Sequence, residues 1–402
     1  MKIAVYFDGV PAAGGRYSYQ HTVLNILKEY ADDRHEFVFF CENGNARRVI
    51  EQIGLQAVEL PQGVFTRILR TLCRQSWTQS SGIFNKLLPN PLDRLFSEHQ
   101  IDLVYFVGQH VVPMELKQHN FVLTLFDLCH LEETEFPEVS FSRQFEGRED
   151  YFRRVLPKAV AVIVDSNYGQ KLACEKYNLD PARVVSLPFV VDKFYLEQNA
   201  ALSTDDLVLE RNSITRPYIF YPAQFWPHKN HIYLLEAIKH LKDIEGWPIQ
   251  LVLSGSDKGN LNVILEKARL LGIVDLVKYV GFVEQADLYV LYKNALSLVM
   301  PTYFGPTNIP PLEAAAVGCP VCYSDKPSFR EQMGEGAFYM DLDKPESLAV
   351  HLISIRDNKP LVNERVAKAK EKLKQWEAGD FWTGLSNVFS KYERKLACWK
   401  RL

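Results

Sequence analysis

Short apolar runs alternate with helix-like segments along the whole chain, and this alternation limits the possible folds more than any other feature of the sequence. In the segment 231–241, for example, leucine and isoleucine side chains recur at helical spacing and share one face. Such alternation predicts an α/β fold, with parallel sheets covered by helices on both faces. The expected strands are 2–7, 36–40, 103–106, 121–126, 160–164, 218–221, 249–254, 277–280, 297–299 and 321–323, and helices are expected at 19–30 and 231–241.

The alternation restarts near Tyr218, after a polar stretch at 198–217 that we interpret as a linker. A chain of 402 residues suits two domains or three, because a domain usually holds about 150 residues. We therefore expect two α/β domains of about 200 residues each, one on either side of this linker.

The composition is that of a globular protein, with 47% hydrophobic and 24% charged residues. Lys plus Arg is 46 and Asp plus Glu is 49, so the formal charge of -3 predicts no chain-wide surface for nucleic acid. Seven irregularly spaced cysteines indicate reduced thiols, and no apolar run approaches the length of a membrane span. We expect a cytoplasmic protein.

One stretch of the first half has a local charge that the overall balance hides. Residues 60–92 contain no Asp or Glu, and Arg67, Arg70 and Arg74 fall on one face of a predicted helix. Such a helix can lie on an anionic membrane surface, which would place the protein on the inner face of the membrane. The alternative is the solvated face of an ordinary amphipathic helix.

Two turns between a strand and a helix are candidate phosphate-binding sites. Gly14 and Gly15 follow the first strand, although the dinucleotide spacing GxGxxG is absent. In the second half, Lys229 lies between a strand end and a helix start, where a cation suits a diphosphate. The neighbouring His228 and His231 could be metal ligands, but no third ligand of suitable spacing follows them.

The segment 303–318 contains a glycine-containing loop, two prolines and an alanine-rich helix. Asn308 suits the N-cap position, and prolines are tolerated in a first helical turn. The loop amides and the helix dipole together predict an anion cradle. Glu313, which we place in the first turn, either accepts hydrogen bonds from sugar hydroxyls or complements the dipole.

Three further motifs have both a chemical and a structural interpretation. Asp127 and His130 follow a strongly apolar strand, as polar groups at the edge of a catalytic cleft do. The Cys319–Cys322 pair has CxxC spacing, but core thiols are favoured over a redox or zinc site. Asp341 and Asp343 form a DxD motif, for which helix capping is favoured over metal binding.

With these residues assembled, the chain resembles glycosyltransferase family 4, the retaining sugar transferases of the GT-B fold. The segments that carry the resemblance are YPAQFWPHKNH, VGFV, FGPTNIPPLEA and GCPVCYSD, which follow one another between residues 221 and 325. The resemblance implies two Rossmann-like, doubly wound domains, 1–200 and 201–380, that face each other across a cleft. It also implies a C-terminal helix within 381–402 that crosses back to the first domain.

The resemblance also implies roles for single residues. Lys229 matches the family's diphosphate-binding lysine, and Glu313 matches the second glutamate of its E-x7-E pair, which holds the ribose. Thr307, Asn308 and Ile309 would lie beside the diphosphate and sugar. Val283 would contact the base, and the Gly14–Gly15 loop would border the donor site. Asp127 and His130 would orient the acceptor or the sugar.

Three positions depart from the family's pattern. Gln224 replaces a phosphate-binding arginine, Gly305 replaces the first glutamate of the pair, and Phe126 replaces a histidine. Loss of one cation beside a leaving diphosphate removes a stabilising effect on the order of 3 kcal/mol.

The sequence therefore predicts a metal-independent, cofactor-free transferase of hexose from a nucleoside-diphosphate sugar, with GDP-mannose as the leading guess. The acceptor would be a hydroxyl of a glycan or a lipid-linked molecule in cell-surface polysaccharide assembly. Alternatives are a nucleotide-sugar-binding pseudoenzyme or scaffold, a GT-B-type nucleotide-sugar epimerase, and a metal-dependent transferase that uses the DxD motif.

Overall fold

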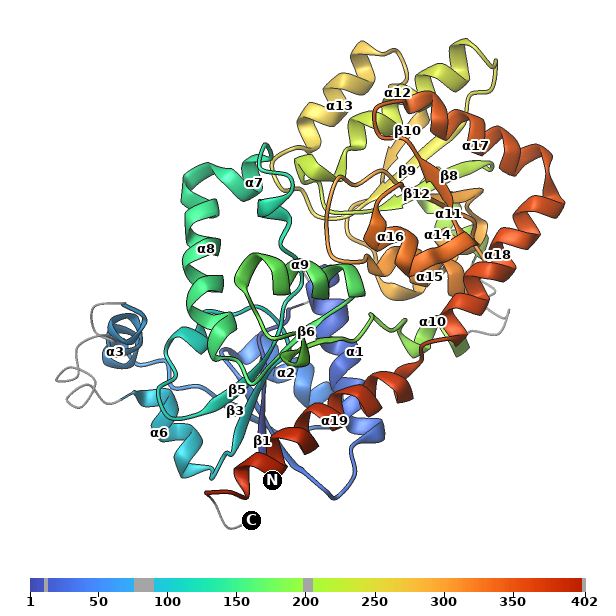
Figure 1. Cartoon of the computed structure of the whole chain (residues 1–402). Coiled ribbons are helices and arrows are strands. Elements are labelled where there is room, and N and C mark those ends of the chain that lie inside the picture. The colour runs from blue at the N-terminus through green and yellow to red at the C-terminus, as the bar shows by residue number, and fades with distance from the viewer. Residues whose placement is uncertain (11–13, 76–89, 198–204, 400–402) are drawn as a thin grey trace. The chain divides into compact units, whose positions relative to one another are not determined.

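The computed structural model describes residues 1–10, 14–75, 90–197 and 205–399, which form two compact units (Figure 1). Unit 1 contains Met1–Leu128, Phe145–Leu187 and Ala378–Leu402, and unit 2 contains Cys129–Gln144 and Pro188–Glu377. Each unit has one parallel β-sheet with helices between its strands. The prediction of two parallel-sheet α/β domains is confirmed.

Unit 1 has a seven-stranded sheet in the order β3-β2-β1-β4-β5-β6-β7. Its central strands are almost wholly buried, because a parallel sheet covered on both faces needs apolar side chains on both. The strands are β1 (Lys2–Phe7), β2 (Glu36–Cys41), β3 (Ala57–Glu59), β4 (Leu103–Phe106), β5 (Asn120–Thr124), β6 (Ala161–Val164) and β7 (Val184–Ser186).

The α-helices of unit 1 connect these strands, apart from the last one. They are α1 (Gly15–Tyr30), α2 (Gly44–Gln52), α3 (Val64–Arg74), α6 (Pro91–Glu98), α8 (Gln144–Val155), α9 (Asn167–Tyr177) and α19 (Ala378–Leu396). Short 3-10 helices lie at Val112–Met114, Leu156–Lys158 and Pro181–Arg183.

Unit 2 has a six-stranded sheet in the order β10-β9-β8-β11-β12-β13. The order reverses at β8, so the loops after β8 and β11 lie at a topological switch point, where open α/β sheets bind ligands. The strands are β8 (Tyr218–Pro222), β9 (Gln250–Ser254), β10 (Val277–Tyr279), β11 (Ser297–Met300), β12 (Val321–Ser324) and β13 (Phe338–Met340).

The helices of unit 2 include one from the early part of the chain. They are α7 (Pro137–Ser140), α10 (Lys193–Glu197), α11 (Asp205–Arg211), α12 (His231–Asp243), α13 (Leu261–Leu270), α14 (Gln285–Asn294), α15 (Ile309–Val317), α16 (Pro327–Met333), α17 (Pro345–Asp357) and α18 (Lys359–Lys374), with 3-10 helices at Cys129–Leu131, Phe141–Arg143, Pro227–Lys229, Val274–Leu276 and Gly334–Gly336. Among the described residues, no helix combines the length and the apolar character that a membrane span requires.

The C-terminal helix α19, red in Figure 1, packs against unit 1. Phe389 is fully buried there, with its ring centroid 5.9 Å from that of Tyr105 and 6.0 Å from that of Phe37. The Tyr392 hydroxyl donates to the carbonyl of Asp102 at 3.2 Å. The last helix thus completes the core of the unit that contains the first strand.

The differences from the expected elements concern weak local signals. The outer strands β3, β7 and β13, which were not among the expected strands, have three residues each and leave little pattern to detect, although the equally short β10 was expected at 277–280. The expected linker at 198–217 contains helix α11, while residues 198–204 lie outside the described part of the chain.

Candidate active site

Lys229 ends a 3-10 turn, Pro227–Lys229, between strand β8 and helix α12. Asn230 has a left-handed backbone with φ 54° and lets α12 begin immediately afterwards. The Tyr221 hydroxyl donates to the carbonyl of Lys229 at 3.0 Å, which holds the turn against the strand. The Lys229 ammonium lies 3.4 Å from Asn308 Oδ1, so the structure brings two predicted site residues together.

Asn308 occupies the N-cap position of α15, as predicted, but its side chain does not cap the helix. Its Nδ2 instead donates to the Tyr323 hydroxyl at 2.7 Å, and its carbonyl accepts from Gln332 at 2.7 Å. The side chains of Thr307 and Ile309 are mostly buried, so these residues can contact a ligand mainly through backbone groups. Pro310 and Pro311 have no N–H, and the Asn308 N–H donates to the Tyr323 hydroxyl at 3.3 Å, so the charge that suits an anion at this helix start comes mainly from Lys229.

Glu313 lies further into α15 than the sequence suggested. The helix begins at Ile309, which places Glu313 beyond the first turn, so the dipole interpretation is wrong. Its Oε2 accepts from the Tyr292 hydroxyl at 2.7 Å, and the side chain is 9% exposed. Burial raises the pKa of Glu313 to about 7, although hydrogen bonds from Tyr292 and Tyr195 oppose the rise.

The remaining donor-side residues lie in the loops that follow β8, β9 and β10. Gln224 Oε1 accepts from the Trp226 ring nitrogen at 3.1 Å. A Cβ at Gly255 would lie 2.4 Å from the carbonyl oxygen of Ala223, so a glycine is required there. Val283 is half-buried in the loop between β10 and α14.

The two histidines beside Lys229, His228 and His231, contact other protein side chains. The backbone N–H of His228 donates to Glu138 Oε1 at 3.0 Å, and its ring Nδ1 lies 2.5 Å from the same oxygen. His231 is buried, and its ring stacks on Phe225 with centroids 4.5 Å apart. Burial, with the nearby Lys229 charge, lowers the pKa of His231 to about 3, so the ring is neutral at pH 7. Within the described ranges, no group of three or more His, Cys, Asp or Glu side chains is arranged to hold a metal.

In unit 1, Gly14 and Gly15 begin helix α1, as the strand-to-helix turn predicted. Gly14 has φ 65°, and a Cβ at Gly15 would meet nothing within 4 Å. Arg16 pairs with Asp8 and donates to the carbonyl of Gln109 at 3.0 Å. The sequence offered no motif for this cation beside the glycines.

Asp127 and His130 differ strongly in their surroundings. Asp127 belongs to unit 1, where Oδ1 lies 3.6 Å from a nitrogen of Arg148. His130 belongs to unit 2, and its side chain is completely buried, whereas a polar edge of a cleft was expected. Phe126 packs edge-on against Tyr19, with ring centroids 5.4 Å apart, and thus takes part in core packing of unit 1.

Gly305, which stands where the family has the first glutamate of the E-x7-E pair, has a backbone conformation that requires glycine. Its φ is 146°, a backbone conformation that favours glycine, and a Cβ would lie 3.2 Å from Asn308 Oδ1. A glutamate cannot occupy this position without a change in the loop. The backbone conformation of this loop therefore explains why position 305 has a glycine and no carboxylate.

The CxxC and DxD motifs both have structural roles. Cys319 and Cys322 are free, buried thiols, and burial raises the pKa of each to about 12. The Asp341 carboxylate accepts from the backbone of Asp343 at 3.0 Å and pairs with Lys344 at 3.2 Å. These contacts form a turn before α17, but the N-cap of that helix is Lys344 and no side chain caps it, so the capping interpretation is wrong for Asp341 and Asp343.

The arginines of α3 do not form one free cationic face. Arg70 is 5% exposed and pairs with Glu115 and Glu42, both at 2.9 Å. Arg74 also pairs with Glu115. Burial alone would lower the pKa of Arg70, but the two carboxylates raise it. The membrane-facing interpretation of Arg70 and Arg74 is wrong, because both charges are neutralised within unit 1.

The sequence did not reveal the contribution of Cys129–Gln144, which we call the strap. It follows strand β5 of unit 1 but packs within unit 2. Phe136 contacts Tyr303, with ring centroids 5.2 Å apart, and Glu138 binds His228 beside Lys229. Burial opposes the charged form of Glu138, but the hydrogen bonds from His228 outweigh it and lower the pKa. No local motif signals these contacts, because they are long-range in sequence.

The comparisons with known proteins agree with this geometry. Residues 210–374, which contain Lys229 and Asn308, match the family model of glycosyl transferases group 1. The chain is 24% identical to O-antigen chain mannosyltransferase B of Escherichia coli over 259 residues, 64% of this chain and 66% of the relative. It is 31% identical to O-antigen chain mannosyltransferase RfbU of Salmonella typhimurium over 211 residues, 49% of this chain and 52% of the relative. The chain thus spans between about half and about two thirds of the length of these relatives.

Solved structures resemble the protein over nearly its whole length. HepE from Anabaena, crystallised with UDP-glucose, has a TM-score of 0.72 at 16% identity and covers 98% of this chain and 100% of its own. WaaG, a glycosyltransferase involved in lipopolysaccharide biosynthesis, has a TM-score of 0.67 at 14% identity, with 96% and 98% covered. The chain therefore has the GT-B fold, and the family match, the relatives and the fold together support a glycosyltransferase, as the sequence predicts.

Proposed function

We propose that this protein transfers a hexose from a nucleoside-diphosphate sugar to a hydroxyl of a glycan or lipid-linked acceptor, with retention of the anomeric configuration. The observation that carries the proposal is the meeting of the Lys229 ammonium and Asn308 at the uncapped start of α15. The bond between the anomeric carbon and the diphosphate oxygen breaks, a bond to the acceptor oxygen forms, and the proton of the acceptor hydroxyl passes to the released diphosphate or to solvent. Lys229, together with the backbone amides of Thr307 and Ile309, stabilises the charge on the leaving diphosphate without a metal.

The identity of the nucleotide and of the sugar is a proposal that rests on the names of the relatives. Two relatives are named mannosyltransferases of O-antigen chains, which favours GDP-mannose and cell-surface polysaccharide assembly. HepE was crystallised with UDP-glucose, which makes a UDP-sugar the competing donor. Screening the protein by native mass spectrometry against both donors decides between them.

Replacing the lysine tests the proposed chemistry. We expect Lys229→Ala to reduce transfer at least about a hundredfold, because an electrostatic contact to developing charge is removed from the transition state. Lys239→Ala on the exposed surface of α12 is the matched control and should leave transfer unchanged. Turnover of Lys229→Ala close to that of the unaltered protein would contradict the proposal.

A second candidate is a nucleotide-sugar-binding scaffold, which the glutamine at 224 and the glycine at 305 favour. Donor binding without turnover on any acceptor would support it. An epimerase would instead convert the donor in the absence of an acceptor, and product analysis of donor alone separates that activity from transfer.

Peripheral membrane association also stays a proposal. Among the three arginines first considered, Arg67 is the exposed one, and it lies beside the exposed side chains of Val64, Phe65 and Ile68. Co-sedimentation with anionic vesicles tests it, and we expect Arg67→Glu to reduce binding. Absence of binding by the unaltered protein would exclude the association.

A further inference from the structure

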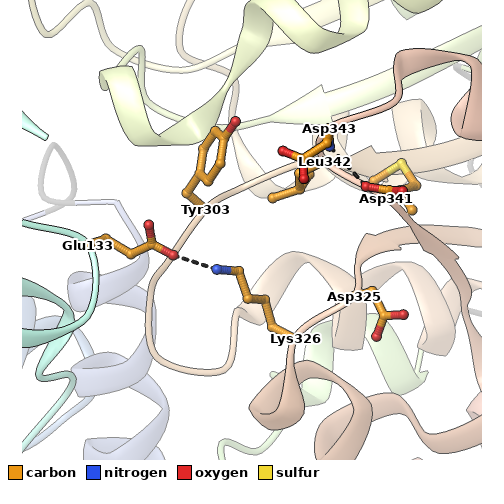
Figure 2. A pocket seen from close by; sticks show the side chains of 8 residues that line it. Glu133, Tyr303, Asp325, Lys326, Asp341, Leu342 and Asp343 are labelled. Carbon is orange, nitrogen blue, oxygen red and sulfur yellow. Dashed lines mark hydrogen bonds and ion pairs between the residues drawn. The ribbon is translucent and has the colours of Figure 1, made fainter. Parts of the chain in front are cut away.

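A pocket of about 440 Å³ lies within unit 2. Its volume falls in the range of small-molecule sites, roughly 300–1,000 Å³. Figure 2 shows the side chains that line it, with Tyr303 and Asp343 on one side and the Glu133–Lys326 pair across from them. The lining residues are Glu133, Tyr303, Asp325, Lys326, Met340, Asp341, Leu342 and Asp343.

The strand order shows where the pocket lies relative to the proposed donor. Along the carboxyl edge of the sheet, the loop with Val283 follows β10, Lys229 follows β8, and Asn308 follows β11. The pocket is formed by the loops after β11, β12 and β13 and by the strap. Neighbouring strands are about 4.8 Å apart, so the pocket begins about one strand beyond the diphosphate position, on the side opposite to the base.

One backbone contact connects the pocket directly to the lysine turn. The N–H of Tyr303 donates to the carbonyl of His228 at 2.9 Å, immediately before Lys229. The pocket wall and the diphosphate site therefore share one rigid loop. In the orientation that the proposed function assumes, with the base beside Val283 after β10, the sugar end of the donor lies on the side of the pocket.

The charges of the pocket disfavour an anion. Lys326, the one cation of the lining, is already paired with Glu133 at 2.5 Å. Asp325 and Asp341 are paired from outside with Arg330 and Lys344. The carboxylate of Asp343 makes no hydrogen bond or ion pair with the described residues, so one negative charge remains uncompensated. A phosphate would face this charge without an available cation.

Two uncommitted polar groups suit sugar hydroxyls. The Tyr303 hydroxyl makes no hydrogen bond within the described structure, and burial, with the charges of Asp343 and Glu133, raises its pKa and keeps it protonated. It can donate a hydrogen bond while the Asp343 carboxylate accepts one, and a sugar hydroxyl does both. Met340 and Leu342 supply the apolar surface that the C–H face of a sugar ring needs.

We propose that this pocket binds an uncharged sugar ring, and that phosphorylated sugars are excluded from it. The ring belongs either to the donor or to the acceptor, since both present the same hydroxyl chemistry at this end of the site. The assignment rests on the proposed function, because the donor defines the direction along the sheet edge.

Saturation-transfer NMR on the full chain tests the pocket with methyl glycosides of glucose, mannose and galactose, each beside the corresponding hexose 6-phosphate. We expect at least one methyl glycoside to bind, and its 6-phosphate to bind at least about tenfold more weakly. Asp343→Asn and Tyr303→Phe should each weaken the glycoside about tenfold, by loss of a hydrogen bond to the ring. Asp275→Asn, at an exposed aspartate of unit 2, is the matched control.

The source of the ring follows from the same variants. If the ring is the donor's, Asp343→Asn weakens binding of the nucleoside-diphosphate sugar but not of the nucleoside diphosphate. If it is the acceptor's, the substitution raises KM for the acceptor and leaves KM for the donor unchanged. Absence of glycoside binding, equal binding of the 6-phosphates, or no effect of either substitution overturns the proposal. Nucleoside-diphosphate binding that depends on Lys229 would persist in that case, so the proposed function is judged separately.

Discussion

The buried carboxyl group of Glu313 is hydrogen-bonded by tyrosine hydroxyls and not by a cation. Its folded-state pKa of about 7 exceeds the ordinary value of 4.5, so folding takes up a proton between these values. The same group is the candidate contact for a ribose, and an ionised carboxylate is the better hydrogen-bond acceptor. Donor recognition and stability therefore favour opposite protonation states of one side chain.

This conflict predicts a specific pH dependence of stability. The stabilising effect of the protonated carboxyl is complete below pH 4.5 and is lost as the pH rises toward 7, by on the order of 3 kcal/mol. We expect Glu313→Gln to flatten this part of the unfolding profile, measured by urea denaturation at several pH values. Glu284→Gln, at an exposed glutamate of the same unit, should keep the slope of the unaltered protein. An unchanged slope in Glu313→Gln would mean that the group titrates normally.

Residue identity alone predicted where Lys229 and Asn308 lie in the fold, but not all of their contacts. Lys229 and Asn308 were placed correctly at a strand end and a helix start, because proline, glycine and asparagine mark such turns locally. The side chain of Asn308 turned away from the helix toward Tyr323, which lies on another strand. A preference for N-caps describes local hydrogen bonds, whereas this contact depends on the sheet order.

At the scale of elements, the strap is the part of the fold that sequence patterns could not predict. Strands β1 and β4 were predicted with their observed bounds, because continuous apolar runs of this kind are typical of buried parallel strands. The strap has no such period, and its Glu138 and Phe136 are defined by contacts with residues about ninety positions or more further along the chain. Its influence on Lys229 can be inferred only from the folded structure, in which Glu138 binds the neighbouring His228.

Glu138 should position Lys229 through His228. We expect Glu138→Gln to lower kcat about tenfold with little change in donor KM, because one hydrogen bond that holds the lysine turn is weakened. A double-mutant cycle with His228→Asn should give a coupling of about 1–3 kcal/mol in the free energy of unfolding. Glu135→Gln on the exposed side of the strap is the control. Additive effects of the two substitutions would show that the contact carries no energy.

At the scale of the whole molecule, unit 1 depends on the last helix of the chain. The fully buried Phe389 contacts the aromatic rings of Tyr105 and Phe37, which come from two different strands. The core of unit 1 is therefore built from both ends of the sequence, while unit 2 has a core of its own. The two units have separate sources of stability.

This separation can be measured. We expect Phe389→Ala to lower the free energy of unfolding of unit 1 by about 3–5 kcal/mol, since it leaves a cavity in a packed core. Binding of a nucleoside diphosphate, which we propose for unit 2, should change little at temperatures below unfolding. Phe65→Ala, at an exposed phenylalanine of α3, should have almost no effect on stability. Calorimetry combined with nucleotide titration distinguishes these outcomes, and an equal loss of both properties would show that the units fold as one.

The division of the chain has a consequence for how the protein is made. The polypeptide passes from one unit to the other after Leu128, Gln144, Leu187 and Glu377. During synthesis, unit 2 can close once residue 377 has left the ribosome, whereas unit 1 must wait for α19, which is made after the whole of unit 2. The sheet that is translated earlier therefore receives its last helix later, and its apolar surface for α19 stays uncovered while unit 2 is being made.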